Sequence, residues 1–93
     1  MESVTFVVQG RDPEALVQCL RIVGKARRHI SRYARINLLF DLTSSECGIV
    51  VEEEGFVDCF DEDYAIDRLI ELTASVIAKR KLVGIAMAAG VEV

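Results

Sequence analysis

Hydrophobic residues at every second position predict an N-terminal strand, and a helix follows it. The alternation covers residues 3–9 and is typical of a strand with one strongly apolar face. Gly10 ends the pattern, after which Asp12 and Pro13 provide the N-cap and the first position of a helix. Apolar residues then recur at helical spacing as far as Ile30, so one side of this helix is expected to lie on the sheet.

The stretch of residues 35–63 is expected to be a contiguous β-meander that organises the fold. Apolar and polar residues alternate over 36–42, and after a polar break the alternation resumes over 47–51, which predicts a hairpin. A second break ends in Gly55, a residue suited to a positive φ. Residues 56–60 then form one more short strand or prolong a bent hairpin, and the pattern leaves both alternatives open.

The C-terminal part predicts a second helix and a last strand. Acidic residues 61–63 suit a helix start, an apolar stripe follows over 66–77, and the basic residues 79–81 complement the negative end of the helix dipole. The helix is therefore expected to end there. Residues 83–93 are apolar on both sides and rich in small side chains, as in a strand that is covered on both faces or paired with another chain.

The predicted element order is βαββ(β)αβ, which favours an α+β sandwich of the ferredoxin-like type. Its antiparallel sheet would carry both helices on one face. With 93 residues and one proline, the chain is expected to form a single domain over 1–93. The opposite face of the sheet would then hold apolar side chains with nothing to cover them, which favours dimerisation through that face or an edge strand. These side chains are Val7, Leu39, Val50, Val57 and several of residues 83–93.

The charges are distributed unevenly along the chain. The net charge is −4, yet residues 15–40 hold six cations and no acid, whereas 41–71 hold eleven acids and one cation. Five basic residues recur at spacings of four and three and predict a second stripe on the first helix. This stripe is either a solvated face or a site for phosphates or an acidic partner. The five residues are Arg21, Lys25, Arg28, Arg32 and Arg35.

Gly24 lies within the first helix, where glycine lowers helix stability by about 1 kcal/mol relative to alanine. Its presence therefore indicates close packing at this position.

An acidic turn, formed by Glu52, Glu53 and Glu54, is the second exposed candidate for contact with a partner. The acids around it do not fit a calcium-binding loop, and solvated carboxylates at a turn are the simpler interpretation. Three cysteines without paired spacing predict packed, reduced thiols rather than a disulfide framework or a zinc site. We therefore expect no metal, no cofactor and no catalytic residue.

The run DLTSSECGIVV after a basic helix resembles half of a sliding-clamp domain, which also pairs such a helix with a β-meander. The chain is too short for the duplicated unit of that family, so we assign it to no family. No apolar run is long enough to cross a bilayer, and a soluble, cytoplasmic protein that does not bind membranes is expected.

The leading functional hypothesis is a non-enzymatic protein-interaction module that self-associates, with a dimer as first choice. It is motivated by an excess of hydrophobic residues, which make up 52% of the chain, and by the missing catalytic signature. The alternative is binding of a nucleic-acid backbone by the basic first helix, although no aromatic residue on a predicted strand offers a stacking surface. A third class, a small-ligand regulatory domain or an enzyme, has only analogy of fold behind it.

Overall fold

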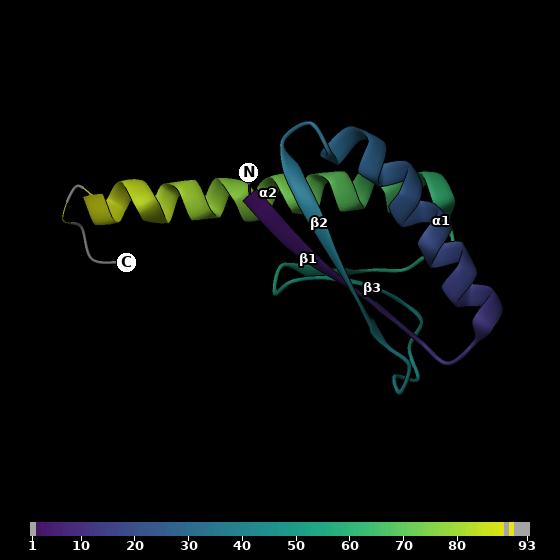
Figure 1. Cartoon of the computed structure of the whole chain (residues 1–93). Helices are drawn as coiled ribbons and strands as arrows, with labels where there is room; N and C mark the ends of the chain where they lie inside the picture. Colours follow the sequence, from purple (N-terminus) through teal and green to yellow (C-terminus); the bar gives the residue numbers. More distant parts are fainter. Residues whose placement is uncertain (1, 89, 91–93) are drawn as a thin grey trace.

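The computed structural model describes residues 2–88 and 90, and it arranges them as one sheet with two helices (Figure 1). In chain order the elements are β1 (Glu2–Gln9), α1 (Pro13–Ile30), β2 (Ala34–Asp41), β3 (Gly48–Val51), β4 (Gly55–Val57) and α2 (Glu62–Ala88). Residues 55–57 are thus a separate short strand, which decides between the alternatives that the pattern left open.

The sheet is mixed, with the strand order β2-β1-β3-β4. β1 pairs with β2 in parallel and with β3 antiparallel, and β3 pairs with β4 antiparallel. The α+β class is confirmed, but the ferredoxin-like order and the wholly antiparallel sheet are wrong. Because α1 carries the chain back across the sheet, β2 begins at the same end as β1 and must run parallel to it.

β1 lies between β2 and β3, so the predicted hairpin of 36–42 with 47–51 does not form. β1 is therefore one of the two inner strands, and the meander is limited to β3 and β4. The apolar alternation in β2 and β3 was recognised correctly, but both strands use it to pair with β1 instead of with each other. Alternation identifies the buried face of a strand and contains no information about the neighbouring strand.

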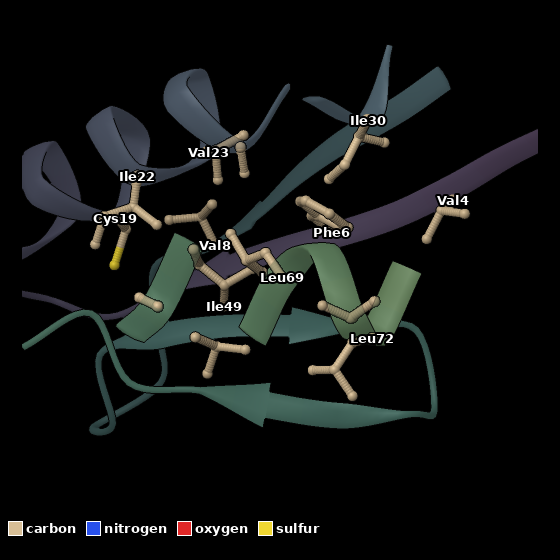
Figure 2. Close-up of a cluster of buried hydrophobic side chains, with 14 of the residues drawn as sticks. Val4, Phe6, Val8, Cys19, Ile22, Val23, Ile30, Ile49, Leu69 and Leu72 are labelled. Carbon is tan, nitrogen blue, oxygen red and sulfur yellow. The ribbon is translucent and has the colours of Figure 1, made fainter. Parts of the chain in front are cut away.

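The hydrophobic core lies between the sheet and both helices. Figure 2 shows side chains of the two helices pointing toward the same face of β1 and β3. From the strands come Val4, Phe6, Val8, Ile49, Val51 and Val57, and from the helices come Cys19, Ile22, Val23, Ala26, Ile30, Ala65, Leu69 and Leu72. The predicted apolar face of β1 is thereby confirmed.

Both helices begin where the sequence predicted. The Asp12 carboxylate accepts a hydrogen bond from the Glu14 N–H at 3.2 Å, and Pro13 occupies the first position of α1. At α2, the Asp61 carboxylate accepts from the Tyr64 N–H at 3.2 Å. These caps depend on residues at most three positions away, which is why the sequence alone locates them.

The end of α2 differs from the prediction. The helix continues past residues 79–81 to Ala88, so the strand expected over 83–93 is wrong for 83–88, and its residues 89 and 91–93 lie outside the described part of the chain. Lys79 and Arg80 do not mark a helix end. They pair instead with carboxylates of β1 and of the β3–β4 turn.

The sheet face opposite the helices carries an apolar row across all four strands. Val7 pairs in register with Leu39 of β2 and with Val50 of β3, and Val50 pairs with Phe56 of β4. The prediction for Val7, Leu39 and Val50 is thus confirmed. It is wrong for Val57, which is buried under α2, while Phe56 takes the exposed position.

Candidate interaction surfaces

The longest exposed strand edge belongs to β2, which pairs only with β1 among the described residues. Its eight residues, ARINLLFD, include a run of large apolar side chains that stay accessible: Leu38 is 36% exposed, Leu39 55% and Phe40 52%. An edge strand of this length offers a row of backbone donors and acceptors to any chain that can pair with it.

One hydrogen bond fixes which backbone groups of β2 point toward the free edge. The Gly10 N–H donates to the Asp41 carbonyl at 3.0 Å, so the backbone groups of Asp41 face β1. Because the register with β1 is continuous and successive residues alternate, the odd-numbered residues of β2 bond to β1. The even-numbered ones direct their N–H and C=O groups outward, and these are Ala34, Ile36, Leu38 and Phe40.

β2 exposes apolar side chains on both of its faces. Leu38 and Phe40 pair in register with the buried Phe6 and Val8, so they lie on the side of the sheet that the helices cover. They stay accessible because the helical layer does not bury this end of β2. Leu39 lies on the opposite face, which makes the C-terminal half of β2 apolar on either side.

A hollow of about 300 Å³ adjoins the N-terminal half of this strand. We call it the edge groove. It is lined by residues 34–37 of β2 and by Arg27 and Ser31 at the end of α1. Neither Arg27 nor Arg35 forms an ion pair with any described carboxylate, so the groove carries two positive charges beside unpaired strand backbone.

The five residues of the predicted basic stripe lie on α1, in the turn after it and on β2. Lys25 pairs with Glu62 of α2 at 2.8 Å, whereas Arg21 and Arg28 are exposed on α1. α1 ends at Ile30, so Arg32 lies in the following turn and Arg35 on β2. The stripe was predicted from helical spacing, and it ends with the helix.

Two of the three acids of the predicted acidic turn bind cations of α2. Arg80 reaches both carboxylate oxygens of Glu52 at 2.7 and 2.9 Å, and Lys79 reaches both oxygens of Glu54 at 2.8 Å. The hydrogen bonds from Lys79 and then Ser75 lower the pKa of Glu54. Only Glu53 is left exposed, so the turn attaches the sheet to α2.

Glu52 also extends the pairing of β1 with β3. Its N–H donates to the Thr5 carbonyl at 3.0 Å, and its carboxylate accepts from the Thr5 N–H at 3.0 Å. The residue adopts φ 45°, so the positive φ of this turn falls on Glu52 and not on Gly55 as the sequence suggested. The side chain explains why Glu52 adopts this conformation. At φ 45° the backbone turns away from β1, and the carboxylate still accepts the hydrogen bond from the Thr5 N–H.

Replacing Glu52 with alanine is expected to lower the free energy of unfolding by about 1–2 kcal/mol, because the Thr5 N–H loses its acceptor. Urea denaturation followed by circular dichroism measures the change. Glu53→Ala, at an exposed position of the same turn, is the matched control and should change stability by no more than about 0.5 kcal/mol. Equal effects of the two substitutions would contradict the role given to Glu52.

The three cysteines are free thiols, and two of them meet in the core. Cys19 of α1 and Cys59, which follows β4, are buried, as the sequence predicted. A hydrogen bond from the Cys59 thiol lowers the pKa of Cys19, and the same contact together with burial raises the pKa of Cys59. Cys47 is half-buried beside a hollow that Asp58 also lines.

Among the described residues no cluster of three or more His, Cys, Asp or Glu side chains could hold a metal ion.

The C-terminal part of α2 extends beyond the sheet (Figure 1). Four large apolar side chains are exposed on it, namely Leu82, Val83, Ile85 and Met87. This surface was missed because the sequence interpretation ended the helix at residues 79–81. Among the described helices, none combines the length and hydropathy needed to span a membrane.

The fold and these surfaces define a small α+β protein with a mixed sheet and an exposed, apolar edge strand. Comparison with known proteins adds no relative: no family model and no curated protein matches the sequence, and no solved structure matches the fold.

Proposed function

We propose that the protein is a non-enzymatic interaction module that self-associates through its sheet, with β2 as the contact strand. The observation that carries the proposal is the unpaired edge of β2, where Leu38, Leu39 and Phe40 are exposed together. A second copy can bury these side chains and pair the free backbone groups in one step. A dimer is the simplest closed assembly of this kind.

The composition of β2 supports this proposal. Monomeric proteins protect edge strands with lysine, proline, bulges or inward-pointing charges. β2 contains no lysine or proline, its register with β1 has no bulge, and its charged residues, Arg35 and Asp41, stand near its ends. Edge pairing is therefore not prevented by any of the usual devices.

The parent chain is expected to be a dimer at micromolar concentrations in light scattering after a sizing column. Phe40→Lys should raise the dissociation constant about tenfold or more, because it places an ammonium group within the paired edge. Leu82→Lys is the matched control, since Leu82 is 65% exposed and lies on the extended part of α2. It should leave the dimer intact.

A monomeric parent chain would refute the proposal. If Leu82→Lys abolishes the dimer and Phe40→Lys does not, the interface lies on α2 and not on β2, which would also refute the proposal. Circular dichroism of each variant verifies that the fold is retained.

Binding of a nucleic-acid backbone has weaker support. A protein that follows phosphates needs several cations on one surface. Here Lys25 is paired with Glu62, and Arg35 lies on a different element from Arg21 and Arg28.

We also propose that the protein is located in the cytoplasm. The three free thiols support this location.

A further inference from the structure

We infer that two copies pair their β2 strands antiparallel about a two-fold axis at Leu38, so that Arg35 of each copy faces Asp41 of the other. This pairing rests on the proposed self-association and specifies its register and its recognition elements. It would join two four-stranded sheets into one continuous sheet of eight strands. Three properties of β2 select this register.

The first property is the direction of the free backbone groups. In an antiparallel pair, hydrogen bonds form only between residues whose N–H and C=O groups face the partner strand. On the free edge of β2 these are the even-numbered residues, as the bond from Gly10 to Asp41 establishes. Leu38 can therefore pair with Leu38 of the second copy, and Ile36 with Phe40. Registers that place an even residue opposite an odd one cannot form the hydrogen bonds.

The second property is charge. With the axis at Leu38, the position opposite Arg35 is Asp41 of the second copy, and the symmetry produces this ion pair twice. A two-fold axis at Asn37 would place Arg35 opposite Leu39, and an axis at Leu39 would place it opposite Thr43. Both alternatives satisfy the backbone rule but leave the charges unpaired. Opposite charges at facing positions stabilise a strand pair and fix its register.

The third property is the edge groove. Residues 34–37 line it, and in this register they face residues 39–42 of the second copy. Asp41 of that copy then lies opposite Arg35, one of the two cations of the groove. Its Oδ1 already accepts from the Thr43 N–H at 3.0 Å and from the Thr43 hydroxyl at 2.6 Å, which leaves Oδ2 for Arg35.

The apolar residues of the strand fit the same arrangement. Ile36, Leu38 and Phe40 lie on the helix-facing side, so the pairing of Ile36 with Phe40 brings six apolar side chains of two copies together. Leu38 and Phe40, the two that the helical layer of their own copy leaves exposed, are covered there. On the other face Leu39 meets Asn37 of the second copy.

Reversal of the charges tests the register directly. Arg35→Glu places two acids opposite each other at both ends of the pairing, and Asp41→Arg places two cations there. Each variant alone should dissociate about tenfold more readily than the parent chain. An equimolar mixture should form a heterodimer. At one end the introduced glutamate of one chain faces the introduced arginine of the other, and at the other end the unchanged Asp41 faces the unchanged Arg35. Arg21→Glu, with the same change in net charge on an exposed part of α1, should leave association unchanged.

Disulfide cross-linking tests the same register without changing the charge of either strand. In a Cys47→Ser background, Asn37→Cys, Leu38→Cys and Leu39→Cys each form a symmetric cross-link only when the axis passes through the substituted position. Leu38→Cys is expected to cross-link fastest.

The possible failures are distinguishable. If the parent chain is dimeric but both charge variants associate as the parent does, or if cross-linking is fastest at 37 or 39, the register is overturned and the proposed function stands. A dimer without any of the three cross-links overturns the pairing about an axis at 37, 38 or 39. A monomeric parent chain removes the proposed function and the pairing with it.

Discussion

Replacing Phe6 with alanine is expected to lower the free energy of unfolding by about 3–5 kcal/mol, a loss large enough to unfold many small domains. Phe6 is fully buried near the middle of the inner strand β1, and its ring lies among side chains from both helices (Figure 2). Removing the ring leaves a cavity that elements on all sides would have to fill. Urea denaturation followed by circular dichroism measures the change.

Phe60→Ala is the control for this substitution. Phe60 is 94% exposed, so the same loss of a phenyl ring should change stability by no more than about 0.5 kcal/mol. The comparison separates burial from residue type. Similar losses at the two positions would contradict the core described for the sheet and helices.

Replacing Gly48 with valine is expected to cost about 3 kcal/mol, the upper end of the usual range for overpacking. A Cβ atom at Gly48 would meet the Phe56 ring and would lie 2.7 Å from the Val57 carbonyl oxygen. The ring can rotate away, but the carbonyl belongs to the paired backbone of β4 and cannot move without breaking the β3–β4 ladder. Thermal denaturation gives the loss.

Gly24→Ala is the matched substitution at a glycine without such contacts. Apart from the backbone of its own helix, no atom lies within 4 Å of a Cβ built at Gly24, so the close packing that the sequence suggested there is wrong. Alanine should raise the free energy of unfolding by about 0.5–1 kcal/mol through helix propensity. A loss at Gly24, or no loss at Gly48, would contradict the packing described for the two positions.

The candidate surfaces were predictable only in part. The sequence identified Leu39 as an uncovered apolar residue and Arg35 as an exposed cation, and both contribute to the β2 edge. It did not indicate that β2 is an edge strand, because that depends on β1 taking the place between β2 and β3. The extended apolar part of α2 is hidden from the sequence for a different reason, since the cations at 79–81 are typical of a helix end.

The features that can be predicted from the sequence are local ones. The start of α1 at Asp12 and Pro13, the capping of α2 by Asp61 and the buried face of β1 depend on residues a few positions apart, and short-range patterns specify them.

The packing of the whole chain determines which strands are neighbours, which edge is open and what the acidic turn binds. The partners in those contacts are distant in the chain: Arg80 reaches Glu2 and Glu52, and Gln9 pairs with both Asp41 and Gly48. Such contacts are selected by the burial of the whole core, in which α1 crosses over the sheet and places β2 beside β1. A periodic pattern indicates that one face of a strand or helix is apolar. Packing against the rest of the chain determines which element covers that face.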